Sequence, residues 1–137
     1  MRINRNKFIY LISPNKIYKN FYRDLRKVLK TNKIAFFQLR LKKNSYDNKI
    51  KIAKKVKIIC QAFKVKFLIN DEPKLTYQVN ADGCHLGQND MAVNDARKLL
   101  KKKIIGVTCH NSIRLAKIAI KQKADYLAFG AFNITKN

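Results

Sequence analysis

A row of polar side chains ends one of the apolar runs of this sequence. Gln38, Arg40 and Lys42 alternate at the end of the segment AFFQLRL (35–41), and alternate positions of an extended strand lie on one face. In a buried strand such a row is costly unless it faces a site, although the solvated face of an edge strand would also accommodate it. Arg holds phosphate through its planar fork and Lys holds it as a point charge. The row therefore indicates a binding site for a diphosphate.

Two carboxylates follow the next two apolar runs. Asn70 and Asp71 end the segment KFLIN (66–70), and Asp90 follows GCHLG (83–87). Each Asp alone is typical of a turn or a helix cap. The pair is more telling in a chain with only 8 acidic residues, because two carboxylates on adjacent loops beside cationic groups suit a Mg²⁺ that bridges phosphate oxygens. We expect Asp71 and Asp90 to bind Mg²⁺.

Thr108 and His110 alternate at the end of IIGVTCH (104–110). We expect the Thr108 hydroxyl to donate to phosphate, whereas His110 is either a ligand-facing base or a hydrogen-bonded core residue. The dipeptides Cys84-His85 and Cys109-His110 could suggest metal ligation. Neighbours in a strand point to opposite faces, so each dipeptide offers one ligand to a shared site. Core packing of the cysteines is therefore expected rather than zinc binding.

Strand-length apolar runs alternate with segments of helical periodicity along the whole sequence. The expected strands are 8–13, 35–41, 66–70, 83–87, 104–110 and 126–132, and the expected helices are 17–31, a segment capped by Ser45, 73–79, 94–102 and a segment capped by Ser112. This order is typical of a parallel sheet covered by helices. The turn at 13–16 (SPNK) is not glycine-rich, and neither GxGxxG nor GxxxxGK[ST] occurs, which disfavours dinucleotide and P-loop sites. An α/β fold of the TIM (β/α)8 barrel type is predicted, with about six βα units present.

The ordered motifs resemble one known family. They are YLISP (10–14), QLRLK (38–42), LIND (68–71), DGCHLGQND (82–90), IIGVTCHNS (104–112) and ADYLAFGAF (124–132), and together they look like those of thiamine-phosphate synthase. The resemblance implies a transferase that joins hydroxymethylpyrimidine diphosphate to thiazole phosphate, with Mg²⁺, and releases pyrophosphate. A related thiazole tautomerase shares the fold and many motifs, but the Asp90 carboxylate favours the synthase.

The resemblance also implies roles for individual residues. Gln38, Arg40, Lys42 and Asn70 would bind the pyrimidine diphosphate, and Asp71 and Asp90 would hold Mg²⁺. Thr108 occupies the position of a diphosphate-binding serine, and Thr135 corresponds to the first of the threonines that bind phosphate. Arg40, Lys42 and Thr108 would then be the catalytic residues.

The length predicts a single domain over residues 1–137 that is incomplete at its C-terminus, because a TIM barrel needs eight strands and roughly 200 residues. Two interpretations stay open: a truncated form of a working enzyme, or a catalytically inactive remnant. Unpaired edges on the first and sixth strands predict self-association through the open barrel edge.

The net charge of +23 would attract polyanions. The lysines are spread over nearly every expected helix rather than gathered in one arm, so a solvated surface is expected and a nucleic-acid partner is not. Three cysteines without a CxxC pair indicate a reducing, cytoplasmic location. No apolar run reaches the roughly 18 residues of a membrane helix, so no membrane association is expected.

Overall fold

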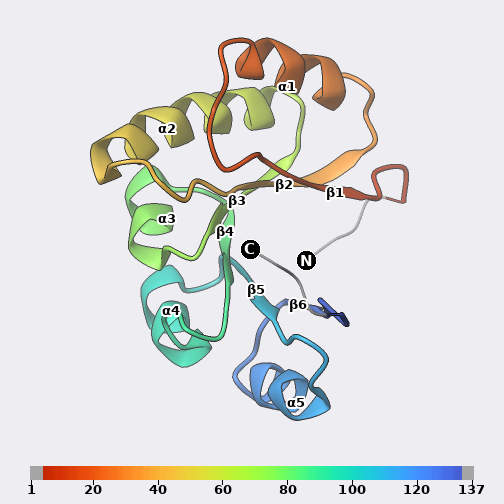
Figure 1. Ribbon diagram of the computed structural model, residues 1–137, viewed down its shortest axis with the longest axis vertical. Coiled ribbons are helices and arrows are strands. Elements are labelled where there is room, and N and C mark those ends of the chain that lie inside the picture. Colours follow the sequence, from red (N-terminus) through yellow and green to blue (C-terminus); the bar gives the residue numbers. More distant parts are fainter. Residues whose placement is uncertain (1–4, 134–137) are drawn as a thin grey trace.

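A computed structural model of the protein describes residues 5–133. Six parallel strands form one sheet in the order of the sequence, and each strand pairs with the next. The sheet curls into an arc that is open on one side (Figure 1). Its strands are β1 (Ile9–Ile12), β2 (Ile34–Leu39), β3 (Lys66–Asn70), β4 (Gly83–Leu86), β5 (Ile104–Thr108) and β6 (Tyr126–Ala128).

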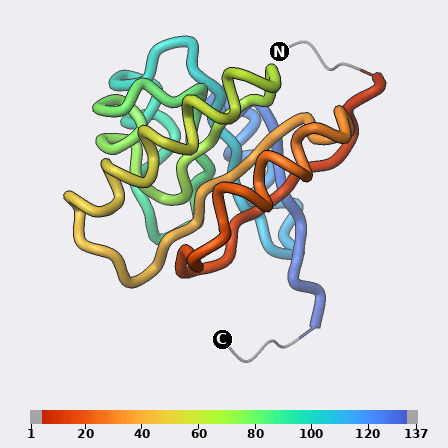
Figure 2. The backbone as a smooth tube through the Cα atoms, turned by 90° about the horizontal axis from the view of Figure 1, so that it is seen from above, coloured from red at the N-terminus to blue at the C-terminus, as the bar shows by residue number. Residues whose placement is uncertain are grey.

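Five helices connect the strands and follow the outer side of the arc, and the view from above shows them stacked along it (Figures 1 and 2). They are α1 (Phe21–Leu29), α2 (Tyr46–Ala62), α3 (Pro73–Val79), α4 (Val93–Leu100) and α5 (Ile113–Lys121). The predicted βα alternation is therefore confirmed. None of the helices within residues 5–133 is long and apolar enough to cross a bilayer.

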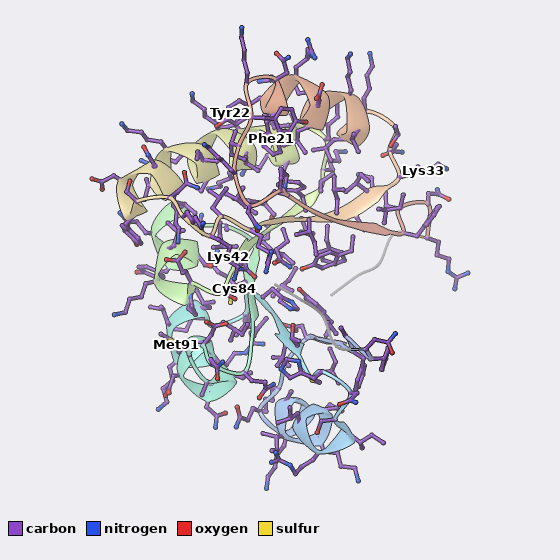
Figure 3. The ribbon with its side chains drawn as sticks, in the orientation of Figure 1. Phe21, Tyr22, Lys33, Lys42, Cys84 and Met91 are labelled. Carbon is purple, nitrogen blue, oxygen red and sulfur yellow. The ribbon has the colours of Figure 1, made fainter. Side chains whose placement is uncertain are left out.

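Alternate side chains of each strand pack outward against the helices. Phe37 of β2 and Phe67 of β3 are buried in one apolar cluster beneath α1 and α2. Figure 3 labels Phe21 on α1, whose ring lies 6.2 Å from that of Phe37. A second cluster beneath α4 and α5 contains Cys84, Leu86, Ile105 and Val107. All three cysteines are free and buried, as core packing predicted.

The other side chains of each strand face the concave side of the arc. These inward positions include Tyr10, Gln38, Asn70, His85, Thr108 and Tyr126. The inner face therefore carries polar and aromatic side chains, whereas the outer face is apolar. Because the strands are parallel, their carboxyl ends lie at one rim of the arc.

Local chemistry explains where several elements begin. The hydroxyls of Ser45 and Ser112 accept hydrogen bonds from the amides of Asn48 and Leu115, so both predicted helix caps are confirmed. The helix expected over 17–31 covers only Phe21–Leu29, and Val28 within it is exposed. Phe21, Leu25 and Leu29 recur every fourth residue and fill the contact with the sheet, which leaves Val28 beside that stripe.

The last two strands are shorter than predicted. β5 ends at Thr108 instead of His110, because His110 has a left-handed backbone (φ 51°) that turns the chain away from the sheet. β6 covers only Tyr126–Ala128 of the expected 126–132. His110 is therefore held by a turn, whereas Thr108 stays in the ladder opposite Ala128.

Candidate functional site

Three charged side chains meet at the carboxyl ends of β2, β3 and β4. The Lys42 ammonium lies 3.2 Å from Oδ2 of Asp71, and in the view of Figure 3 Lys42 lies over the middle of the arc. Asp71 directly follows β3 and has a left-handed backbone (φ 68°), and its amide donates to the carbonyl of His85. This bend holds the Asp71 carboxylate at the rim beside Lys42.

Asp90 comes to the same place from the loop after β4. Partial burial and a hydrogen bond with the Asp71 side chain raise the pKa of Asp90, while the Gly87 amide, which donates to Oδ2 at 2.7 Å, and the charge of Lys42 favour its ionised form. Two carboxylates that oppose each other's ionisation in this way create a local demand for positive charge. The predicted proximity of Asp71 and Asp90 is therefore borne out.

This donor set fits Mg²⁺. Magnesium in phosphate-handling sites is bound by one or two carboxylates together with substrate phosphate oxygens and water, and Asp71 and Asp90 supply two carboxylates. No group of three or more His, Cys, Asp or Glu side chains that could hold a metal ion occurs within residues 5–133.

Arg40 and Lys42 leave β2 in different directions. The Arg40 guanidinium donates to Oδ1 of Asn15 at 2.8 Å, and the Arg40 amide donates to the Ser13 hydroxyl. Lys42 instead turns to Asp71. Beside it is a pocket of about 360 Å³ lined by Asn15, Lys16, Lys42, Lys43 and Asn44. Of the cations expected from the sequence, Lys42 thus lines this rim pocket, whereas Arg40 contacts Asn15 of its lining.

Gln38 lies deeper than the rest of the polar row and is buried. Its Nε2 donates to the hydroxyl of Tyr10 at 2.8 Å, and that hydroxyl is 2.6 Å from the hydroxyl of Tyr126. This contact joins β1 to β6 across the concave side of the sheet. Burial raises the pKa of both tyrosines, so they stay neutral at ordinary pH.

His85 continues this contact to Thr108. Its Nδ1 lies 2.8 Å from the Tyr126 hydroxyl and its Nε2 lies 2.7 Å from Oγ1 of Thr108. The side-chain Nε2 of Gln88 donates to the backbone carbonyl of Thr108 at 2.7 Å. Burial lowers the pKa of His85, which keeps the ring neutral. We call Gln38, Tyr10, Tyr126, His85 and Thr108 the interior network.

A glycine makes room for this network. A Cβ on Gly106 of β5 would overlap the ring of Tyr126, so only a residue without a side chain leaves space for that ring, which also stacks on His85 with centroids 5.6 Å apart. The sequence interpretation missed Tyr10, His85 and Tyr126. Their signal was available, since each is a polar or aromatic residue at an inward-facing position of an otherwise apolar strand.

The remaining predicted residues are less closely connected to the rim. Asn70 ends β3 on the concave side, opposite His85 in the register of β3 and β4. His110 is exposed in the turn after β5, so the interpretation as a core histidine is wrong. Thr135 lies outside the described residues.

The sequence of this chain is similar to those of known proteins that share one family. A family model described as thiamine monophosphate synthase matches residues 9–137. A protein named thiamine-phosphate synthase from Pelagibacter ubique (strain HTCC1062) is 66% identical over 136 residues, which are 98% of this chain and 65% of that protein. One of the same name from Marinobacter nauticus (strain ATCC 700491 / DSM 11845 / VT8) is 47% identical over 96 residues, 69% of this chain and 43% of that protein.

A solved structure agrees with the curled sheet. The thiamine phosphate pyrophosphorylase from Pyrococcus furiosus superposes with a TM-score of 0.80 at 26% identity, and covers 89% of this chain and 59% of its own. The six parallel strands therefore form part of a TIM-type barrel, as predicted. The chain spans less than two thirds of the length of each of these relatives.

Proposed function

The chain belongs to the thiamine monophosphate synthase family, and on that premise we propose that the protein is a transferase of thiamine biosynthesis, a thiamine-phosphate synthase. It would join hydroxymethylpyrimidine diphosphate to thiazole phosphate. The bond between the pyrimidine methylene carbon and the diphosphate oxygen breaks, the thiazole nitrogen bonds to that carbon, and pyrophosphate leaves with the electron pair. The products are thiamine phosphate and pyrophosphate.

The observation that carries this proposal is the grouping of Lys42, Asp71 and Asp90 at one rim. A departing diphosphate is the species that gains charge in the reaction, and cations placed where charge develops stabilise it. Lys42, which lines the rim pocket, would hold the diphosphate as a point charge, and Arg40 would hold it through its planar fork. The Asn15 contact would orient the guanidinium before the ligand arrives.

Asp71 and Asp90 are the residues we propose for Mg²⁺. A bound Mg²⁺ would neutralise charge on the leaving diphosphate. The protein's own contribution is to keep the two carboxylates together, which costs repulsion in the free protein and favours a cation between them and the substrate. Lys42 supplies part of that positive charge without metal.

Gln38, Asn70 and Thr108 are proposed to contact the pyrimidine diphosphate, and Thr135 is proposed to bind phosphate. Gln38 and Thr108 take part in the interior network, which would orient them. We further propose that the residues form one domain, supported by the continuous sheet, and that the protein works in the cytoplasm, supported by three unpaired cysteines.

The test is an assay for thiamine phosphate and pyrophosphate formation with Mg²⁺. The chain would be measured alone and joined to the portion of the Pelagibacter ubique relative that follows the 136 matched residues. We expect the joined protein to be active and Lys42→Ala in it to lower kcat/KM at least tenfold, because a hydrogen bond to a charged group contributes about 1.5–3 kcal/mol. Lys54→Ala, at an exposed position of α2 away from the rim pocket, is the matched control.

Two results would count against the proposal. Absence of turnover in a folded joined protein would favour an inactive remnant. Isomerisation of a thiazole substrate without any use of the pyrimidine diphosphate would favour the tautomerase.

A further inference from the structure

The interior network has more proton donors than one arrangement can use, and this restricts the direction in which its hydrogen bonds run. Its first member is fixed, since Nε2 of Gln38 carries only donors and gives one to the Tyr10 hydroxyl. Tyr10 has one proton of its own. Within residues 5–133 the other polar group at hydrogen-bonding distance from that hydroxyl is the Tyr126 hydroxyl at 2.6 Å, so Tyr10 donates to Tyr126.

The direction of the next hydrogen bonds, from Tyr126 through His85 to Thr108, follows in the same way. Tyr126 already accepts from Tyr10, and its own proton is donated to Nδ1 of His85 at 2.8 Å. An imidazole whose Nδ1 accepts a hydrogen bond carries its one ring proton on Nε2. Nε2 then donates to Oγ1 of Thr108 at 2.7 Å. The proton of the Thr108 hydroxyl is left to point away from His85.

If the hydrogen bonds ran in the opposite direction, from Thr108 to Tyr10, a buried proton would be left without an acceptor. If Thr108 donated to Nε2 and Nδ1 donated to Tyr126, Tyr10 would accept from both Gln38 and Tyr126. Its own proton would then lack an acceptor among the described residues, although the hydroxyl is largely buried. An unused buried donor costs about 1–3 kcal/mol in general. In the direction from Gln38 to Thr108, the proton without an acceptor in the network is instead that of Thr108 at the end of β5, where a bound ligand can accept it.

We infer that Tyr126 and His85 are positioning residues that fix Thr108 as a hydrogen-bond donor toward an anionic ligand at the rim, through a network that runs in one direction from Gln38. Ionised phosphate oxygens only accept hydrogen bonds, so a hydroxyl held as a donor suits them, whereas a hydroxyl that donates to His85 does not. This inference rests on the proposed function for the identity of the ligand. Gln88 contributes by holding the Thr108 carbonyl.

The first test reads the tautomer of His85 directly. The sequence contains only two histidines, so a long-range proton–nitrogen NMR spectrum of the ¹⁵N-labelled chain has two ring systems, and a His110→Gln variant assigns them. We expect His85 with a protonated Nε2 and an unprotonated Nδ1. A proton on Nδ1 would overturn the inference, whatever the protein catalyses.

Two conservative variants separate the effect of the hydrogen-bond direction from that of the packing of the tyrosine rings. Tyr126→Phe removes the donor to Nδ1, so His85 should lose its single tautomer while the ring packing is retained. Tyr10→Phe leaves that donor in place, and the Nε2–H tautomer should persist. Tyr77→Phe, at an exposed tyrosine of α3, is the matched control. An unchanged tautomer in Tyr126→Phe would contradict the inference.

The second test measures binding of inorganic pyrophosphate with Mg²⁺ by calorimetry, in the chain as given. Tyr126→Phe should weaken it about 2- to 10-fold, the effect of one lost hydrogen bond, and Tyr77→Phe should not. Equal affinity in the Tyr126→Phe variant and the parent would contradict the positioning role. A protonated Nε2 in a protein that never binds pyrophosphate would instead count against the proposed function.

Discussion

At the scale of single residues, the site combines groups whose charges oppose one another. Asp90 and Asp71 are close enough to raise the pKa of Asp90, and an ion pair at the rim joins Lys42 to Asp71. Such an arrangement lowers the stability of the free protein slightly and favours ligands that bring a cation. Removal of one carboxylate should therefore raise the free energy of unfolding of the metal-free protein and reduce the further rise that Mg²⁺ causes.

The Asp90→Asn variant tests these two opposed effects. Without Mg²⁺ we expect its free energy of unfolding to rise by roughly 0.5 kcal/mol, the scale of a partly exposed charge interaction, because the repulsion with Asp71 is gone. Any rise in stability on adding Mg²⁺ should be lost, since a ligand stabilises only the state that binds it. Denaturant unfolding with and without Mg²⁺ measures both effects. Asp95→Asn, on the exposed side of α4, is the control, and an Asp90→Asn protein that still responds to Mg²⁺ would refute the assignment.

His85 gives a dependence of stability on pH. Its pKa in the folded protein lies below the ordinary value of 6.5 because the ring is buried. Below about pH 6.5 the unfolded chain therefore takes up a proton that the folded chain does not, and the free energy of unfolding falls as the pH is lowered toward the folded pKa, by up to about 1.4 kcal/mol per pH unit. His85→Gln should reduce this slope and His110→Gln should keep it. Identical slopes in His85→Gln and the parent would show that the ring is not held neutral.

At the residue scale, the sequence predicted which side chains lie close together where a motif marked a strand end, and the roles of those side chains stay predictions. Asp71 and Asp90 were expected together from their equivalent loop positions, and they are. His110 was misplaced because the turn that removes it from β5 depends on its own left-handed backbone, which no pattern of apolar residues reports. Tyr10 and Tyr126 were missed because their meeting depends on how strongly the sheet curls, and curvature is a property of all six strands.

At the scale of elements, the fold follows from alternating apolar strands and capped helices. β3 and α3 match their expected bounds, since short β-rich and Pro-initiated segments have sharp ends. α1 and β6 are shorter than expected, because apolar residues continue past the point at which tertiary contacts stop. Element type was therefore predictable throughout, and the bounds were predictable for only some of the elements.

The cap of α2 is an element-scale test of this account. Ser45 accepts from the amide of Asn48 at the start of a 17-residue helix. Ser45→Ala should lower the free energy of unfolding by about 1 kcal/mol. Ser45→Asp restores an acceptor and should leave stability close to that of the parent, as measured by denaturant unfolding. Equal losses in both variants would mean that the side chain acts in some way other than by capping.

At the scale of the whole molecule, the sheet has two unpaired edges within the described residues, β1 and β6. Apolar side chains are exposed at both, including Ile12 on β1 at 50% and Phe129 just after β6 at 50%. An exposed apolar strand edge favours pairing with another chain. Self-association of this chain therefore stays a prediction, and the structure identifies the β1 and β6 edges as the surfaces through which it would occur.

Ile12→Lys tests that surface. The chain should associate increasingly with concentration, and a lysine on the β1 edge should weaken association because pairing would bury its charge. Ile58→Lys, at an exposed position on the outer side of α2, adds the same charge away from the edge and is the control. Sedimentation velocity over a concentration series measures the effect. Association that both variants weaken equally would reflect net charge and not the edge.

The overlap between a Cβ at position 106 and the ring of Tyr126 also constrains how this sequence can change over generations. A single substitution at Gly106 would expel the ring and break the interior network, so position 106 can accept a larger residue only after, or together with, a smaller one at position 126. The two positions, one on β5 and one on β6, should therefore vary as a pair among related sequences.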